Sequence, residues 1–253
     1  MEVREVLSIA VLSGEILLTS GSEIYRVEDT IDRICGAYGI KCESFVTPMG
    51  IFVSGWAVNN ENESVSLIKR IRSRTINLHN IELINTFSRN LQNTTIPYHE
   101  ALKILVGIEK APYFSFIKRL TAASITSLAY AILMNGTFVD GIFAAIISIL
   151  IYFILERMKK ADFSQYFSHF ICSFAAGLIS VSAGKFIDAL NINAIIVGSI
   201  MILVPGLAIT NGIRDALHGD MLSSQARIVE ALLIVTTIGV GVGMALLLMK
   251  YWM

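Results

Sequence analysis

The sequence has few of the residues that mark cross-linked, metal-bound or nucleic-acid-binding proteins. It contains 3 cysteines and 4 histidines in 253 residues. The cysteines form no CxxC pair and have no histidine at ligand spacing, so we expect reduced packing residues and no metal site. The 20 basic and 20 acidic side chains leave a formal net charge of +0. A nucleic-acid partner is therefore not indicated.

Several catalytic and nucleotide-binding motifs are also missing. The sequence has no phosphate-binding loop ending in Gly-Lys-Ser/Thr, no GxSxG and no HExxH. These absences argue against ATP-driven transport by this chain and against common hydrolase or zinc-protease chemistry. We therefore expect no enzyme activity, no cofactor and no metal. The first ten residues carry Glu2 and Arg4 and do not resemble a signal peptide.

Long apolar runs are what the sequence does have. Its hydrophobic fraction is 54%, above the roughly 45–50% of soluble proteins. Of the 40 charged residues, 26 lie in residues 1–119 and 14 in residues 120–253. This asymmetry predicts an α-helical membrane protein with a soluble α+β domain at residues 1–112. Residues 113–253 would then form a domain of about five transmembrane helices.

The spacing of apolar residues changes along the N-terminal part. Helical periodicity over residues 3–19 is followed by Ser22, a candidate N-cap for a second helix from Glu23 to about Tyr38, with Gly39 as its stop. The expected small antiparallel sheet and two further helices cover residues 41–46, 51–58, 65–71, 79–91 and 98–109. A soluble domain of this length can form a modest core of its own.

The apolar runs predict five spans and their orientation. We place them at about residues 118–135, 138–155, 167–187, 192–211 and 227–249. Lys and Arg precede the first span, follow the second and flank the loop after the fourth, whereas the opposite loops hold only Lys185. The N-terminal domain is therefore expected in the cytoplasm and the C-terminus outside the plasma membrane. Gly239 and Gly243 form a GxxxG pair suited to close helix packing.

Serines inside the spans leave two interpretations open. Ser173, Ser180 and Ser182 lie in the third predicted span. They could line a polar path through the membrane or bond across helices.

The stretch from Leu203 to Asp220 concentrates features of a transport site. Pro205 and Gly206 break the fourth span, and a broken helix can line a cavity or binding site. Asn211, Arg214 and Asp215 follow at i, i+3 and i+4 and share one helix face. With Asp220, these residues form the candidate substrate-binding and translocation site. The alternative is a tolerated kink followed by a headgroup anchor.

The charges in this stretch match a small zwitterion. Arg214 and Asp215 supply the two signs that an amino acid requires, and Asn211 could bond a side-chain hydroxyl. Because they are adjacent, Arg214 and Asp215 could instead neutralise one another. A dicarboxylate would need two positive features, and few cations lie in the spans. Asp215 is also the candidate proton carrier.

A second polar motif lies in the N-terminal domain. Gly21, Glu23, Arg26 and Glu28 surround the start of the second predicted helix. Thr47 and Pro48 occupy the turn between the first two predicted strands. The set could form a ligand or gating surface, or it could be a capped helix with weak surface charge pairs.

Four segments together resemble the threonine/serine exporter family. They are residues 14–40, 45–54, 70–78 and 204–215, beginning GEILLTSGSEIY, FVTPMGIFVS, RIRSRTINL and VPGLAITNGIRD. The resemblance implies a cytoplasmic domain, sometimes described as hydrolase-like, joined to five spans in the lipid bilayer. It also implies export of threonine and serine by a secondary transporter.

The resemblance leaves the substrate and the assembly open. Long family members carry a second block of spans, so it implies a second, smaller membrane subunit for this chain. Related two-component members are linked to succinate, which makes a dicarboxylate exporter subunit an alternative. A membrane-anchored hydrolase-like enzyme or a sensor in residues 1–110 is the other alternative.

Overall fold

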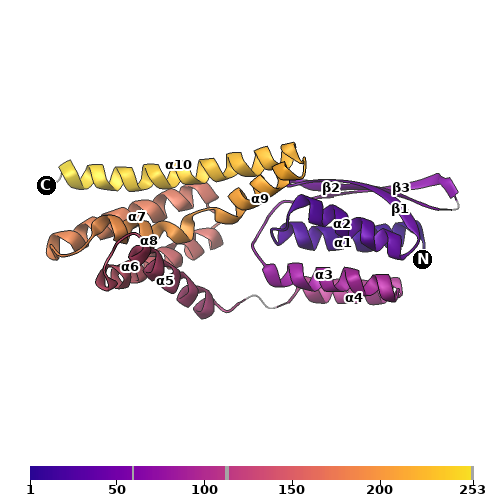
Figure 1. Ribbon diagram of the computed structural model, residues 1–253, viewed down its shortest axis with the longest axis horizontal. Helices are drawn as coiled ribbons and strands as arrows, with labels where there is room; N and C mark the ends of the chain where they lie inside the picture. The colour runs from indigo at the N-terminus through magenta and orange to yellow at the C-terminus, as the bar shows by residue number, and fades with distance from the viewer. Residues whose placement is uncertain (59, 112–113, 252–253) are drawn as a thin grey trace. The chain divides into compact units, whose positions relative to one another are not determined.

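The chain forms two compact units in a computed structural model that describes residues 1–58, 60–111 and 114–251 (Figure 1). The first unit comprises Met1–Tyr113 and Leu207–Ile228, and the second comprises Phe114–Gly206 and Val229–Met253. The predicted boundary between residues 112 and 113 lies outside the described residues. Residues Leu207–Ile228, which we expected in the C-terminal domain, group with the N-terminal unit.

The first unit contains the predicted α+β arrangement. Its elements are α1 (Val3–Thr19), α2 (Ile24–Ala37), β1 (Ile40–Thr47), β2 (Gly50–Ala57), β3 (Asn60–Arg70), α3 (Leu78–Asn93), α4 (Tyr98–Glu109), most of α9 (Gly206–Leu217) and the first turns of α10 (Met221–Tyr251). The helices and the three antiparallel strands expected from periodicity are confirmed. Gly39, the expected stop of α2, has a φ of 70°, a conformation that favours glycine.

The sheet and four helices stack in layers. The strand order is β1-β2-β3, and the register aligns Phe45 with Phe52 and Phe52 with Ile68. Helices α1 and α2 cover one face of the sheet, and α3 and α4 lie on the far side of that helix pair (Figure 1). Side chains such as Leu17 and Ile31 are fully buried between the layers, so apolar burial is the main stabilising term in this unit.

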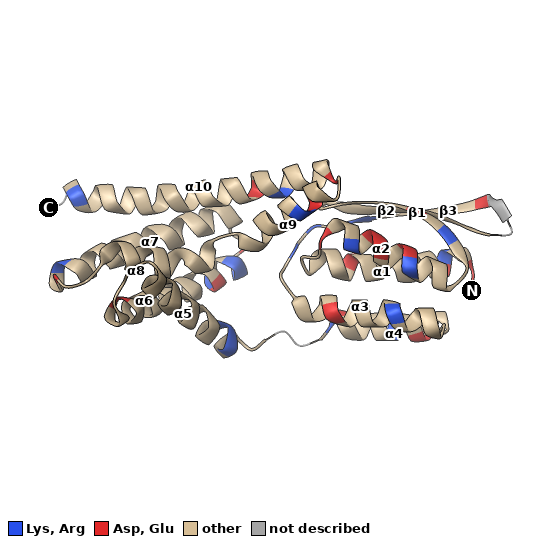
Figure 2. Ribbon diagram, viewed as in Figure 1, with Lys and Arg blue, Asp and Glu red and all other residues tan. Residues whose placement is uncertain are grey.

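The second unit consists of apolar helices. They are α5 (Phe116–Leu133), α6 (Phe138–Lys160), α7 (Gln165–Phe186), α8 (Ile192–Ile200), the 3-10 turn η1 (Met201–Leu203) and the rest of α10. Charged residues are sparse along α5 to α8 compared with α1 to α4 (Figure 2). In the described chain, four helices are long and apolar enough to cross a membrane, or five if Ile192–Leu203 and Gly206–Leu217 form one bent span.

Close helix packing in the second unit uses different glycines from those expected. A Cβ added at Gly241 would lie 2.7 Å from the backbone oxygen of Phe170, and one at Gly177 would lie 2.7 Å from the Cβ of Ala245. A Cβ at Gly239 or Gly243 would meet no described atom within 4 Å. The close contact of α10 with α7 therefore depends on Gly241, which lies between the two glycines of the GxxxG pair.

The serines of α7 bond within their own helix and not across helices. Ser173, Ser180 and Ser182 donate hydrogen bonds to carbonyl oxygens three or four residues earlier in their own helix, at 3.0, 2.8 and 2.7 Å. This local bonding satisfies the hydroxyls without a neighbouring helix.

Candidate functional site

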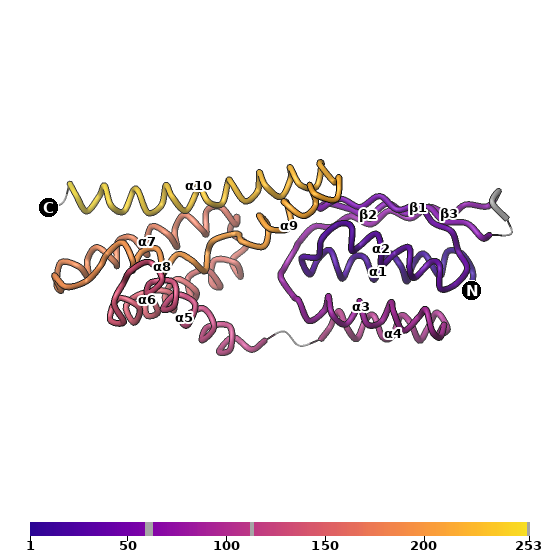
Figure 3. The backbone as a smooth tube through the Cα atoms, viewed as in Figure 1, coloured from indigo at the N-terminus to yellow at the C-terminus, as the bar shows by residue number. Residues whose placement is uncertain are grey.

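The break expected at Pro205 is present. The 3-10 turn η1 ends at Leu203, Val204 is extended, and α9 begins at Gly206 (Figure 3). The two helical segments on either side of the break are bent by 61°. Proline has no N–H to continue the helical hydrogen bonds, which accounts for the break. Beyond it, Asn211 and Asp215 of α9 are buried.

A tight loop in the first unit, Ser20–Glu23, receives these side chains. Gly21 has a φ of 88°, and a Cβ there would lie 3.2 Å from the backbone oxygen of Thr75. Glycine suits this position because it adopts positive φ without strain. The loop presents backbone groups to α9 and α10: Asn211 Nδ2 donates to the Gly21 carbonyl and Arg227 Nη2 to the Ser22 carbonyl, each at 2.9 Å.

Asp215 caps helix α2 from a distant part of the chain. Its Oδ1 accepts a hydrogen bond from the Ile24 backbone N–H at 3.2 Å, and its Oδ2 lies 2.9 Å from Arg227 Nε. The two side chains are 0% and 5% exposed. The prediction that Ser22 is the N-cap was wrong: Glu23 occupies the N-cap position without a side-chain cap bond, and the Asp215 carboxylate takes that role.

Arg214 does not neutralise Asp215. It pairs with Glu23, which also forms an ion pair with Arg26 at 3.2 Å between Oε2 and Nε. Burial alone would raise the pKa of Glu23, but its backbone N–H and the two guanidinium groups outweigh burial and lower the pKa below its usual value. Each member of the Arg214–Asp215 sequence pair therefore has a separate partner in the first unit.

Glu28 and the strand turn form a neighbouring site. Glu28 Oε1 accepts the Val46 N–H at 3.0 Å, and Thr47 Oγ1 accepts the Met49 N–H at 3.3 Å in the hairpin turn that contains Pro48. Asp220 lies in the short connection from α9 to α10 and acts electrostatically on Glu28.

Taken with the contacts of the Ser20–Glu23 loop, the structure brings Gly21, Glu23 and Arg26 to Asn211, Arg214 and Asp215.

The remaining predicted residues do not join that group. Thr47 and Pro48 serve the hairpin turn, and Pro205 and Gly206 lie at the helix break. These four residues shape the backbone at a turn and at a helix break.

Sequence reasoning missed two contributors to this site. Arg227 is one of the basic residues that flank the predicted loop after the fourth span, and His218 is one of the 4 histidines; neither was assigned to a site. In the structure the His218 ring stacks on Tyr25, with centroids 4.0 Å apart and an interplanar angle of 2°. The sequence did offer one signal for Arg227, since it is a lone arginine near the start of a long apolar helix. A buried cation in such a helix requires a buried acid as its partner.

The environment of Glu28 predicts a pH-dependent stability. Burial raises its pKa, the carboxylates of Asp220, Asp32 and Asp215 add to this effect, and the Val46 N–H opposes it. A carboxyl whose folded-state pKa exceeds its unfolded value favours folding as the pH falls through the folded pKa, and disfavours it at higher pH. Glu28→Gln keeps an acceptor for Val46, so we expect its melting temperature to exceed the wild-type value by about 1–3 °C near pH 7. The gain should shrink towards about pH 4.

Glu23→Gln is the matched comparison because its expected sign is opposite. The lowered pKa of Glu23 contributes stability above the unfolded pKa, and this contribution is lost as the pH falls through the folded pKa. Thermal unfolding of the purified protein across pH measures both variants. Equal pH profiles for Glu23→Gln and Glu28→Gln would contradict the assigned environments.

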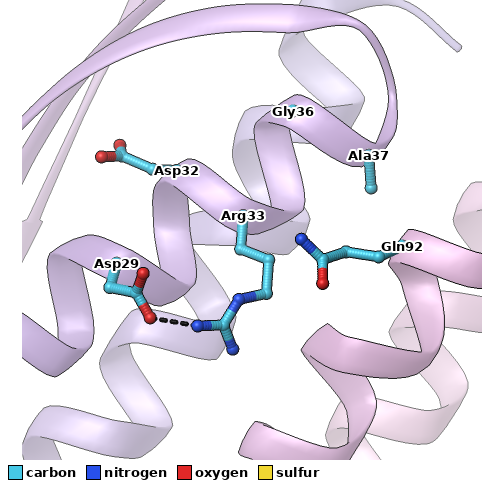
Figure 4. A pocket seen from close by; sticks show the side chains of 6 residues that line it. All are labelled: Asp29, Asp32, Arg33, Gly36, Ala37 and Gln92. Atoms are coloured by element: carbon cyan, nitrogen blue, oxygen red, sulfur yellow. Dashed lines mark hydrogen bonds and ion pairs between the residues drawn. The ribbon is translucent and has the colours of Figure 1, made fainter.

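An open cleft between α2 and α3 is a separate feature of the first unit (Figure 4). Its volume is about 480 Å³, and its lining consists of Asp29, Asp32, Arg33, Gly36, Ala37 and Gln92. The guanidinium of Arg33 is already paired with Asp29. Within the described ranges, no group of three or more His, Cys, Asp or Glu side chains is placed to hold a metal ion.

Comparison with known proteins identifies the family. Residues 8–249 match the model of the ThrE family, described as "Putative threonine/serine exporter". A "Probable threonine/serine exporter" of Mycobacterium tuberculosis is 24% identical over 246 residues, covering 96% of this chain and 46% of that protein. A "Threonine/serine exporter" of Corynebacterium glutamicum is 23% identical over 251 residues, covering 97% and 51%.

These matches have clear limits in length and structure. The chain spans about half the length of the curated relatives it matches. No solved structure matches it. The family model nevertheless covers most of the sequence, from the first helix to the last. The chain is a multi-pass membrane protein that belongs to the threonine/serine exporter family.

Proposed function

We propose that this chain is a subunit of a secondary exporter that moves threonine and serine out of the cell across the plasma membrane. Its family membership supports an exporter role. The paired charges that directly follow the helix break carry the assignment to a charged, polar substrate. Asp215 with Arg227 and Arg214 with Glu23 bring both signs together, which is the requirement for recognising the carboxylate and the ammonium of an amino acid.

The proposed substrate-handling residues lie along α9 and its two ends. The Arg214 side chain is half-exposed, and its buried partner Glu23 keeps an ion pair with Arg26 when Arg214 is released. Asn211 supplies an amide for a substrate hydroxyl, and Asp215 is the candidate proton carrier. Pro205, Gly206 and Asp220 set the backbone path into and out of this helix.

The proposed topology rests on the distribution of basic residues. Lys and Arg precede the first predicted span, follow the second and flank the loop after the fourth, and this bias favours a cytoplasmic N-terminal domain of residues 1–112 and a C-terminus outside. A second, smaller membrane subunit is the proposed partner, as the resemblance to the split members of the family implies.

Efflux from loaded cells tests this function. Export of labelled threonine, serine and succinate would be measured with this chain alone and with a candidate small membrane subunit. We expect threonine and serine efflux that requires both chains. Efflux with this chain alone would remove the partner, and efflux of succinate only would establish a dicarboxylate exporter. No efflux of any of the three, with both chains assembled in the membrane, would refute the export function.

The Arg214→Ala variant tests whether α9 handles the substrate. Removing one charge-assisted contact is expected to reduce threonine efflux about tenfold, the equivalent of roughly 1.4 kcal/mol. Lys159→Ala is the matched control, because Lys159 is an exposed cation at the end of α6. Equal efflux from both variants, at equal membrane levels, would make Arg214 a structural residue only.

A further inference from the structure

The groups that hold Asp215 form a seat for one carboxylate. Two of them bind Asp215 directly: the Ile24 backbone N–H at the start of α2 and the guanidinium of Arg227. Helix N-termini attract anions, and guanidinium groups bind carboxylates strongly. Helix α2 runs for 14 residues, long enough for its dipole to contribute.

The loop that precedes α2 also carries a buried hydroxyl without a hydrogen-bond partner. Ser22 Oγ is fully buried and has no hydrogen-bond partner among the described residues. It belongs to the residue whose carbonyl accepts the hydrogen bond from Arg227. Buried hydroxyls in native proteins normally have a partner. The seat, defined here as Ser22, the Ile24 N–H and Arg227, therefore includes a residue whose buried hydroxyl has no described partner.

We propose that this seat binds the carboxylate of the exported amino acid and that Asp215 fills it between transport events. The proposal rests on the export function given above. It identifies Asp215 as the group with which the substrate carboxylate competes at that site. Exchange of one carboxylate for another never leaves the buried Arg227 without an anion, which would otherwise be costly. A substrate carboxylate can therefore displace Asp215 from the seat, whereas water, which carries no negative charge, cannot.

The exchange frees α9. Asp215 is its fully buried acidic contact with the loop, whereas Arg214, which pairs with Glu23, has a side chain that is 47% exposed. Once released, the Asp215 carboxylate can pair with the ammonium of the bound amino acid. A dicarboxylate instead meets repulsion from Asp215, so the seat selects zwitterions over dianions. A ligand shifts such an equilibrium only by its differential affinity for the two states.

Thiol labelling can detect this release. Ser223 lies one turn before Arg227 on the same face of α10 and is 3% exposed. Ser223→Cys would be introduced into full-length protein in which the three native cysteines, Cys35, Cys42 and Cys172, are replaced by alanine. Maleimide labelling of the purified protein would be followed with L-threonine, with succinate, and with threoninol, which lacks the carboxylate.

We expect L-threonine to accelerate labelling at least about fivefold, and threoninol and succinate to have little effect. Asp215→Asn in the same background should label rapidly without ligand and respond no further. Complete labelling under denaturing conditions and a monodisperse elution profile would show that each variant is folded and its thiol is intact.

Efflux measured in parallel with the same variant separates the two proposals. Threonine efflux without any change in labelling would overturn the seat and leave the export function standing. Equal acceleration by threoninol would also overturn it, because the carboxylate would then be irrelevant. Absence of both efflux and accelerated labelling would overturn the export function and the seat together.

Discussion

Asp215→Asn is expected to destabilise the first unit by about 3–5 kcal/mol, because it removes the buried carboxylate that is paired with the buried Arg227 guanidinium. The Asp215 side chain is fully buried and lies 2.9 Å from Arg227 Nε. Asparagine retains an acceptor for the Ile24 N–H, so the loss is specific to the charge. Chemical or thermal unfolding of the detergent-solubilised protein measures it.

Two further variants isolate the ion pair. Asp220→Asn removes a partly exposed acid only five residues along the chain and should change stability by less than about 0.5 kcal/mol. Combining Asp215→Asn with Arg227→Met removes both charges, and we expect this double variant to be more stable than Asp215→Asn alone. Strictly additive losses would show that the two side chains do not interact energetically.

Gly241→Ala should destabilise the second unit by about 1–3 kcal/mol, the usual cost of overpacking. The added Cβ would lie 2.1 Å from Ser173 Oγ and 2.7 Å from the Phe170 backbone oxygen. The serine side chain can rotate away, but the backbone of α7 can move only by separating the two helices. The melting temperature in detergent and the yield of membrane-inserted protein report the effect.

Gly239→Ala is the control two residues away on the same helix. A Cβ there meets no described atom within 4 Å, and alanine is favoured over glycine in a helix interior by about 1 kcal/mol. We therefore expect Gly239→Ala to be neutral or stabilising. A larger loss for Gly239→Ala than for Gly241→Ala would mean that the GxxxG pair makes the tight contact in the membrane.

Local features of the sequence accounted for most of the elements. The expected helices at residues 3–19 and 98–109 match α1 and α4, because helical periodicity and end signals act over a few residues. The hairpin at Thr47–Gly50 and the break at Pro205 follow from the restricted backbone of proline and the freedom of glycine. The uneven distribution of charged residues separated the apolar helices from the N-terminal part.

The candidate site could be predicted only in part. Asn211, Arg214 and Asp215 were identified from their polarity after a broken apolar run, and Gly21, Glu23 and Arg26 from their grouping at a helix start. That these two groups meet was not predicted, since the bond from Ile24 to Asp215 joins residues 191 positions apart. The wrong N-cap for α2 and the unforeseen pairing of Arg214 with Glu23 have this same origin.

The sequence by itself determined the membrane character of the chain, its helices and strands, the break at Pro205 and the family resemblance. Each of these depends on composition or on neighbours within a turn or two. The tertiary structure alone decided that Arg227 neutralises Asp215, that the Asp215 carboxylate caps α2, and that Gly241 makes the close helix contact. Ion pairing and steric fit depend on distances in space, and folding brings together residues whose separation along the chain carries no local signal.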